Sequence, residues 1–444
     1  MIQLLDPVHC QTGPMDLLKI KPLLSYKGTY RQPGRYKSVI KDYTAYMIER
    51  NGVFLTGFLP RIRQLTDVEV DGELSFPSAH NVPTLPGITP RPDQSELIAA
   101  AVNQGRGVLL SPTGSGKTII AMLLVSCFPH HKTLFLCHTI SLLNQTAEEF
   151  KKFGFDIQVI GGGEKKFSRK TQVTISTVQT FVKIDPKKYG DVFDIIIVDE
   201  AHHLNTPSGQ HAKILKNSIA PMRIGLTATL PNTTQGRLCL EGFIGPVIGE
   251  VTVQEGVEKK ILAKPKIKLV PVPFSSQIGE IYKYVDIYSA GVVNNRTRNR
   301  IIIEEAVKQV ENGQTVLIMV KEIAHGDNLV SMAKDLFGLD AIFVQGKTEG
   351  EIRTLVQQTL DKKIVKCVIC TAVWREGINI KSLNTIILAL GGKSSIQTVQ
   401  ALGRGLRTDV GKDSVLLIDF LDQARYLSQH AIARISIYIE NGWM

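Results

Sequence analysis

The residues best suited to chemistry form a glycine-rich loop between an apolar run, 107–110, and an amphipathic segment. Residues 111–118 read SPTGSGKT, with Ser111 where the strict pattern has glycine. Glycines allow successive backbone N–H groups to turn towards an anion, and a helix that begins behind the loop adds its dipole. The lysine can then contact the β- and γ-phosphates of a nucleotide, and the last hydroxyl can bind Mg²⁺. The predicted nucleotide-binding residues are Pro112, Thr113, Gly114, Ser115, Gly116, Lys117 and Thr118.

Two acidic residues, Asp199 and Glu200, follow a second apolar run, 195–198. The carboxyl end of a buried parallel strand is where carboxylates that hold Mg²⁺ and polarise water belong. Asp199 would hold the ion together with Thr118, and Glu200 would orient or deprotonate the attacking water. Such a pair can also cap a helix, but the upstream phosphate loop favours the catalytic interpretation.

Two arginines, Arg404 and Arg407, lie far along the chain in the sequence QALGRGLR. Their spacing places both side chains on one helical face. Two guanidinium groups aimed together can stabilise the charge that builds up on a γ-phosphate in the transition state. The same arginines could also lie on an exposed helix without such a role. If they act as arginine fingers, hydrolysis is coupled to the meeting of two domains.

These residues must be positioned by elements that alternate in a regular way. Apolar strands are predicted at residues 107–110, 133–136, 173–175, 195–198 and 223–226, with helical patterns between most of them. A second series of strands is predicted at residues 315–319, 341–344, 366–370, 384–388 and 414–418. Short apolar strands that alternate with amphipathic helices predict parallel sheets covered on both faces. The predicted fold class is α/β, with two similar parallel-sheet domains.

The first 85 residues differ from the rest of the chain. Between residues 19 and 63, cations and tyrosines are interleaved with only two acidic residues, and Lys27, Arg31, Arg35 and Lys37 are among these cations. Cations neutralise phosphates and aromatic rings stack on unpaired bases, so we expect nucleic-acid contact here, although a solvated basic domain has the same composition. Five prolines between residues 76 and 92 predict a linker, and residues 251–279 are expected to form a connector.

The composition is that of a globular protein with a positive surface. The 444 residues include 52 Lys and Arg against 41 Asp and Glu, a net charge of +11, which favours a polyanionic partner. A hydrophobic fraction of 43% excludes a disordered chain. Because no apolar run approaches the about 20 residues that cross a bilayer and no signal sequence is evident, we expect a soluble cytoplasmic protein without membrane contact. The six cysteines do not suggest disulfides, and Cys367 and Cys370 are expected to pack in a core.

Four motifs in order resemble those of the superfamily 2 helicases and translocases: PTGSGKT (112–118), DEAH (199–202), TAT (227–229) and QALGRGLR (400–407). The resemblance spans residues 89–419 and implies two RecA-like domains with ATP and Mg²⁺ between them and a nucleic-acid track across the top. The implied domains are a basic N-terminal accessory domain (1–85), a first RecA-like domain (86–255), and a connector with a second RecA-like domain (256–444). In size and layout the sequence is similar to the small phage-encoded branch-migration helicases of the UvsW type.

The resemblance also assigns roles by position. The implied catalytic residues are Lys117, Asp199, Glu200, Gln400, Arg404 and Arg407. Further nucleotide contacts are implied for Arg91, Gln94, Gly377 and Asn379, and Asn379 replaces the aspartate that is usual there. His202, Thr227 and Thr229 resemble groups that link the ATP site to the nucleic-acid track. Thr139, Gln145, Gly161, Gly162 and Thr177 lie in motifs that resemble the strand-contacting ones.

We therefore expect an ATP-dependent DNA helicase or translocase that unwinds or branch-migrates forked and junction DNA in replication, recombination or repair. It would act as a monomer in the cytoplasm, which is the host cytoplasm if a phage encodes it. Two alternatives stay open. One is an RNA helicase, and the other is a motor that moves on duplex DNA or remodels bound proteins without separating strands.

Overall fold

The structure is a computed structural model, and it describes residues 1–32, 39–112, 114–163, 167–252, 255, 264–274, 278, 281–371, 382–391, 414–440 and 442–444. The chain divides into two compact units. The first unit consists of residues 1–111 and 116–251, and the second consists of residues 252–444 with the loop segment 112–115. Within the described ranges, every helix is too short or too polar to cross a lipid bilayer.

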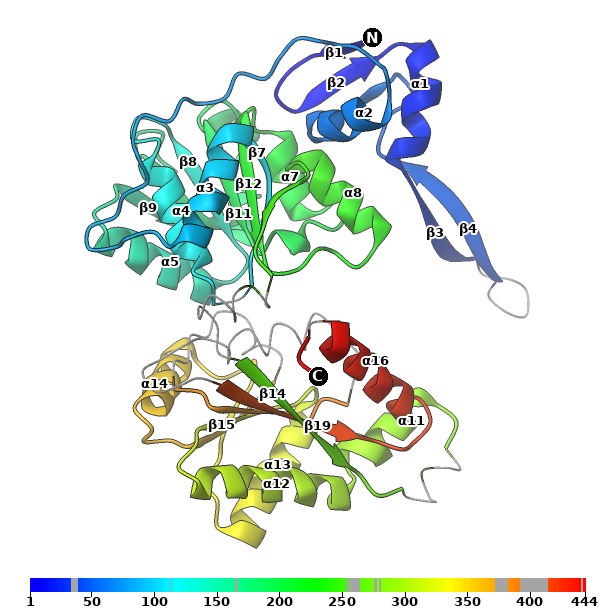
Figure 1. Ribbon diagram of the computed structural model, residues 1–444, viewed down its shortest axis with the longest axis vertical. Helices are drawn as coiled ribbons and strands as arrows, with labels where there is room; N and C mark the ends of the chain where they lie inside the picture. Colours follow the sequence, from blue (N-terminus) through cyan, green and yellow to red (C-terminus); the bar gives the residue numbers. More distant parts are fainter. Residues whose placement is uncertain are drawn as a thin grey trace. The chain divides into compact units, whose positions relative to one another are not determined.

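The first unit begins with a small four-stranded sheet in the order β5-β2-β1-β6. Its elements are β1 (Ile2–Leu4), β2 (His9–Thr12), α1 (Pro14–Ile20), η1 (Lys21–Leu24), β5 (Val53–Leu55), η2 (Thr56–Phe58), α2 (Leu59–Leu65) and β6 (Val70–Asp71). An antiparallel ribbon of β3 (Ser25–Gln32) and β4 (Val39–Tyr46) follows η1, and it extends away from the small sheet (Figure 1). The proline-rich stretch after β6 contains no helix or strand before α3, as predicted for a linker.

A seven-stranded parallel sheet follows, in the order β13-β7-β12-β11-β8-β10-β9. Its strands are β7 (Arg106–Leu110), β8 (Thr133–Cys137), β9 (Ile157–Ile160), β10 (Val173–Thr177), β11 (Ile195–Asp199), β12 (Met222–Thr227) and β13 (Val247–Glu250). The helices are α3 (Pro92–Gln104), α4 (Lys117–Ser126), α5 (Ile140–Lys152), α6 (Val178–Phe181), η3 (Pro186–Lys188), η4 (Ala201–His203), α7 (Gln210–Lys216) and α8 (Thr234–Phe243). Because helices cover both faces, successive residues of one strand enter different cores: Ile195 and Ile197 belong to one buried cluster, and Ile196 and Val198 belong to the other.

The second unit contains a six-stranded parallel sheet in the order β14-β19-β18-β15-β17-β16. Its strands are β14 (Lys264–Pro271), β15 (Val316–Met319), β16 (Ile342–Val344), β17 (Cys367–Cys370), β18 (Thr385–Leu388) and β19 (Ser414–Leu421). The helices are α11 (Tyr284–Tyr288), η5 (Ser289–Val293), α12 (Arg296–Glu311), α13 (Ile323–Phe337), α14 (Gly350–Asp361) and α16 (Leu427–Glu440). The predicted strands of both series are thus confirmed to within a few residues, and Cys367 and Cys370 are buried core residues, as predicted.

The prediction of a simple connector over residues 251–279 is wrong for its centre. β14 pairs in parallel with β19 from Lys264 to Pro271. The prolines at positions 265 and 271 argued against a strand because proline has no N–H to donate. However, β14 lies at the edge of the sheet, where one side of the backbone needs no strand partner and proline is tolerated.

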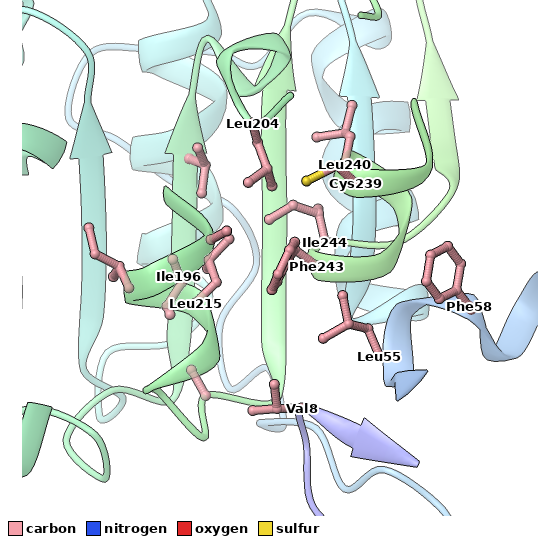
Figure 2. Packing of buried hydrophobic residues seen from close by; sticks show 14 of the residues in the cluster. Val8, Leu55, Phe58, Ile196, Leu204, Leu215, Cys239, Leu240, Phe243 and Ile244 are labelled. Atoms are coloured by element: carbon pink, nitrogen blue, oxygen red, sulfur yellow. The ribbon is translucent and has the colours of Figure 1, made fainter. Parts of the chain in front are cut away.

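The small N-terminal sheet is fixed to the large sheet of the same unit through α8. Figure 2 shows Leu55 and Phe58 beside α8, near Leu240 and Phe243, and all four side chains are buried in one cluster. The two backbones approach closely, because a Cβ atom on Gly57 would lie 2.2 Å from the Glu241 carbonyl oxygen. The contact therefore depends on glycine at this position as well as on apolar packing.

Ion pairing adds to this contact at one point. Arg61 of α2 donates from Nε and Nη2 to both carboxylate oxygens of Glu241, at 2.7 and 2.6 Å. The hydrogen bond to Glu241 raises the pKa of Arg61. Bidentate geometry of this kind fixes the orientation of α2 on α8 as well as holding the two together.

Two buried arginines lie at the end of α8, and in the described part of the chain all of their side-chain hydrogen bonds go to backbone carbonyls. Arg223 donates to Leu215, Ser218, Ala220 and Phe243 at distances of 2.6–3.1 Å. Arg106, the first residue of β7, donates to Pro7, Phe243 and Ile244. Burial lowers the pKa of Arg106 to about 10, and it lowers the pKa of Arg223 as well. The negative end of the α8 dipole, where the Phe243 and Ile244 carbonyls lie, partly compensates these charges.

Replacement of Arg223 by methionine should destabilise the first unit strongly. Arg223→Met keeps an apolar chain of similar length but leaves the carbonyl oxygens of Leu215, Ser218 and Ala220 without this donor, whereas Phe243 keeps Arg106. Each buried unpaired group costs about 1–3 kcal/mol. We expect the free energy of unfolding, measured by urea denaturation, to fall by at least about 3 kcal/mol. The matched control is Arg169→Met, since Arg169 pairs with Asp191 on the surface and such pairs contribute about 0–1 kcal/mol. Equal effects of the two substitutions would contradict the role given to Arg223.

Candidate nucleotide and nucleic-acid sites

The parallel strands of the first large sheet bring the predicted site residues to one edge. Ser111 follows β7, Thr227 ends β12 and Asp199 ends β11, and these three strands are neighbours in the sheet. The Ser111 N–H donates to the Thr227 carbonyl oxygen at 2.9 Å, which fixes the start of the loop against β12. Thr177, at the end of β10, lies further along the same edge. Ligands of open α/β sheets bind at such carboxyl edges.

The loop after β7 has the backbone of a phosphate cradle. Gly114 and Gly116 have φ angles of +93° and +87°, which glycine adopts without strain. A Cβ atom on Gly116 would also lie 2.9 Å from Gln94 Nε2. Ser115 Oγ donates to the Pro112 carbonyl at 2.8 Å and closes the turn. Since α4 begins directly after Gly116, its first N–H groups and its dipole are available to a phosphate.

Lys117 and Thr118 occupy the first two positions of α4. Lys117 Nζ donates to the Ser111 carbonyl at 3.3 Å, which places the ammonium group beside the loop. Its positive charge acts to lower the pKa values of both Asp199 and Glu200. The lysine thus lies where it can serve both a phosphate and the acidic pair.

The acidic pair is buried, and its two members have opposite pKa shifts. Burial, followed by the charge of Glu200, raises the pKa of Asp199 to about 7. Burial also acts to raise the pKa of Glu200, but the hydrogen bond to His202 and the charges of Lys117 and His202 outweigh it and lower that pKa to about 2. Glu200 has a φ angle of +48°, a strained value for a residue with a side chain.

This environment fits a divalent cation. Asp199 and Thr118 offer oxygen ligands, which Mg²⁺ prefers, and the raised pKa of Asp199 indicates a carboxylate whose charge is under-compensated by the protein. A cation at this position would stabilise the ionised form of Asp199. The predicted Mg²⁺ ligands are therefore compatible with the chemistry of the site.

The three residues predicted to couple the ATP site to nucleic acid lie together. His202 Nδ1 is 3.0 Å from Thr227 Oγ1 and 3.4 Å from Glu200 Oε2. Thr227 Oγ1 donates to the Thr229 carbonyl at 2.8 Å. His202 and Thr227 are buried. A short polar chain thus runs from the acidic pair to the loop that contains Thr229.

Arg91 and Gln94 lie at the start of α3, beside the phosphate loop. The Arg91 backbone N–H donates to Gln94 Oε1 at 3.2 Å, and the Arg91 guanidinium group pairs with Asp93 at 3.1 Å. Gln94 is buried, with Nε2 close to Gly116 as described above. This placement is compatible with adenine recognition, and that role stays a prediction.

The predicted strand-contacting residues follow β8, β9 and β10. Thr139 Oγ1 accepts a hydrogen bond from the Leu142 N–H and caps α5. Gly161 and Gly162 follow β9 with φ angles of +147° and +62°. Thr177 Oγ1 donates to Thr180 Oγ1 at 2.9 Å. Gln145 instead lies inside α5 and donates to Glu149.

Of the remaining predicted site residues, two lie within the described part of the chain. Lys27 and Arg31 lie in β3 of the ribbon, in register with Thr44 and Ile40 of β4. The other predicted residues lie outside the described residues: Arg35, Lys37, Thr113, Gly377, Asn379, Gln400, Arg404 and Arg407.

Sequence reasoning missed three histidines that gather at the same edge. His138 follows β8, His203 lies in η4 and His211 lies in α7. Because they come from three separate elements, no motif contains them together. The His202–His203 doublet after the acidic pair was the only signal in the sequence.

Two known domain families match the chain. The family described as Type III restriction enzyme, res subunit, matches residues 87–232, and the family described as Helicase conserved C-terminal domain matches residues 297–409. These matches fall on the two parallel-sheet domains in the order that the motifs predicted.

Known proteins with related sequences have helicase or translocase names. The ATP-dependent DNA helicase uvsW of Enterobacteria phage T4 is 26% identical over 385 residues, which are 80% of this chain and 76% of that protein. The DNA 3'-5' translocase XPB2 of Sulfurisphaera tokodaii is 26% identical over 349 residues, which are 71% of this chain and 77% of that protein. 

Solved structures agree on the fold. The fragment structure of a putative HsdR subunit of a type I restriction enzyme from Vibrio vulnificus covers 78% of this chain and 66% of its own, with a TM-score of 0.59 and 18% identity. The two domain families in tandem, the ordered motifs and the helicase relatives together support the superfamily 2 helicase resemblance of this chain.

Proposed function

We propose that this protein is an ATP-dependent DNA helicase or translocase that unwinds or branch-migrates forked and junction DNA in replication, recombination or repair. The observation that carries the proposal is the shared carboxyl edge of the first large sheet, where the phosphate loop follows β7, the acidic pair lies at the end of β11, and the strand-contacting motifs lie at the ends of β8, β9 and β10. The two relatives described above are named as a DNA helicase and a DNA translocase, which favours DNA over RNA. A net charge of +11 supports contacts to phosphates that do not depend on base sequence.

Several residues of the first unit would each have a separate role in ATP hydrolysis. Lys117 and the N-terminus of α4 would compensate charge on the β- and γ-phosphates of ATP, and Glu200, which its lowered pKa keeps ionised, would orient the attacking water. Mg²⁺ held by Thr118 and Asp199 would supply further positive charge to these phosphates. Gln400, Arg404 and Arg407 of the second domain would act on the γ-phosphate, in keeping with the resemblance.

Coupling to DNA would pass through the polar chain at the sheet edge. His202 contacts both Glu200 and Thr227, so a shift of the Thr227–Thr229 loop changes the surroundings of the catalytic carboxylate. The strand-contacting motifs follow β8 and β10, and β8 is the direct neighbour of β11, which carries Glu200 at its end. DNA binding therefore has a short route to the hydrolytic residues.

The β3–β4 ribbon is the second DNA contact that we propose. Tyr30 and Tyr43 are 48% and 41% exposed, with ring centroids 6.2 Å apart, and Lys41 lies opposite Tyr30 in the register. At its base the ribbon is anchored by Tyr26, which is buried in the core with α8. Exposed aromatic rings beside cations suit unpaired bases and phosphates, which meet at a fork.

The proposal as a whole is tested by comparing ATPase stimulation and strand displacement with single-stranded DNA, RNA, forks, four-way junctions and blunt duplex. We expect forks and junctions to stimulate hydrolysis and to be unwound. Greater stimulation by RNA would favour an RNA helicase, and stimulation without strand displacement would favour a duplex translocase.

Within that experiment, Lys117→Ala should lower the ATPase rate by at least about a hundredfold, because it removes a cation from the developing charge. DNA affinity, measured by fluorescence anisotropy, should stay within about twofold of wild type. Lys170→Ala is the matched control, since Lys170 is exposed and precedes β10, at the opposite end of the strands. Normal turnover by Lys117→Ala would refute the assignment of the site.

Removal of a ribbon tyrosine should weaken fork binding specifically. A stacked base contributes about 1–3 kcal/mol, so Tyr30→Ala or Tyr43→Ala should weaken the affinity for forked DNA at least about fivefold. The ATPase rate without DNA should be unchanged. The control is Tyr282→Ala, which removes a tyrosine that is 75% exposed in the second unit. If all three variants bind forks like wild type, the ribbon is not a DNA contact.

A further inference from the structure

A cavity of about 220 Å³ opens near the ends of β8 and β11, next to the strand-contacting motifs. It is lined by His138, Gln179, His203, Leu204, Asn205, Thr206, Gly209, Gln210 and His211. His211 and Leu204 are buried, whereas Gln179, Asn205, Thr206 and Gln210 are exposed. The lining thus has a buried part formed by η4 and α7 and a polar, exposed part.

The three histidines that line the cavity present nearly parallel rings. The His138 and His203 centroids are 3.7 Å apart with planes 6° from parallel. The His138 and His211 centroids are 6.4 Å apart with planes 7° from parallel. The inner faces of such a stack cover one another, and an outer face of the stack can receive a further planar ring.

The lining is polar, and two of its histidines are held in the neutral form. Burial, and then the neighbouring His202 and His138, lower the pKa of His203 to about 3, and burial lowers the pKa of His211 to about 4. Among the described residues, the lining contains no Lys, Arg, Asp or Glu. A phosphate would favour Lys or Arg partners, so this lining suits a neutral ligand better than an anion.

The available hydrogen-bonding groups narrow the ligand class. Gln179, Asn205 and Gln210 carry amides, each with both donors and an acceptor, and Thr206 carries a hydroxyl. His138 Nδ1 and His211 Nε2 have no hydrogen-bond partner among the residues that the structure describes, but both atoms are closed to solvent, so the exposed amides and the hydroxyl supply the contacts to a ligand edge. Unstacked nucleobases are flat, neutral and polar rings. Proteins recognise them with side chains that stack on the ring and hydrogen-bond to its edge.

The cavity is also close to the hydrolytic residues. The His203 ring centroid lies 4.2 Å from that of His202, and His202 Nδ1 lies 3.4 Å from Glu200 Oε2. The His203 and His202 side chains therefore connect a ligand stacked on the histidines to the Glu200 carboxylate.

We infer that this cavity receives one unstacked nucleobase of the bound DNA strand, and that its occupation contributes to the stimulation of ATP hydrolysis. This inference rests on the proposed function and adds a base contact to a track that otherwise holds phosphates. The contact would tolerate any base, because stacking depends on the π-face and the amide side chains can reverse their donors and acceptors.

The test compares a single-stranded thymidine oligonucleotide with one of equal length in which a central run of nucleotides is abasic. Both carry the same phosphates, so contacts to the backbone alone predict equal ATPase stimulation. We expect the abasic oligonucleotide to bind at least about fivefold more weakly to wild type, in line with the loss of one stacked base. In His138→Ala, which lacks the middle ring of the stack, this difference should shrink to the part that the ribbon tyrosines contribute, and in Tyr30→Ala it should keep the part that the cavity contributes. His130→Ala, at an exposed position after α4, should behave like wild type.

A cross-linking measurement on the unaltered protein covers the case in which His138→Ala fails to fold. DNA that contains 4-thiothymidine should form photo-adducts with His138 or with residues 203–211. Equal responses to the two oligonucleotides, or adducts only elsewhere, would overturn the base cavity while leaving the helicase proposal intact. Failure of every DNA to stimulate hydrolysis would overturn both.

Discussion

Two adjacent carboxyl groups lie at the carboxyl end of β11, and the residues around them in the first unit must compensate their negative charge. Asp199 and Glu200 cannot both hold a negative charge in a poorly solvated position without positive partners. Lys117 lies at the start of the helix after β7, and His202 lies within reach of Glu200. Because β7, β12 and β11 are adjacent and parallel, these partners arrive from three strands at one place. Charge remains under-compensated at Asp199, and a cation with a nucleotide would complete the balance.

The buried arginines of the same unit show the opposite solution to a similar problem. Arg106 and Arg223 are as deeply buried as the acidic pair, but carbonyl oxygens take up their side-chain hydrogen bonds. A group satisfied by its own chain has no need of a ligand, so it serves as a joint between elements. A group left under-compensated is where binding and chemistry can occur. Within one domain, the buried arginines therefore hold elements together, whereas the acidic pair is available for binding and chemistry.

The sequence predicted those parts of the molecule that are encoded locally. Most strands of the two large sheets follow from short apolar runs, although the edge strands β9 and β13 were not predicted. The phosphate loop follows from glycines and a lysine at fixed spacing. β14 was missed because Pro265 and Pro271 argue against a strand unless it is known to lie at a sheet edge. The histidine stack was missed because His138, His203 and His211 come from separate elements and meet only after folding. Roles carried by residues 400–407 rest on the motif alone, since these residues lie outside the described ranges.

The attachment of the β3–β4 ribbon has a mechanical consequence. Tyr26 at the base of the ribbon packs in the same core as Phe58 and α8, and the last carbonyls of α8 bind the guanidinium group of Arg106. Arg106 is the first residue of the strand that leads directly to the phosphate loop. A force on the ribbon would therefore pass through α8 and the Arg106 hydrogen bonds to the start of the strand that precedes the phosphate loop. The β3–β4 ribbon and the phosphate loop are thus mechanically connected within the first unit.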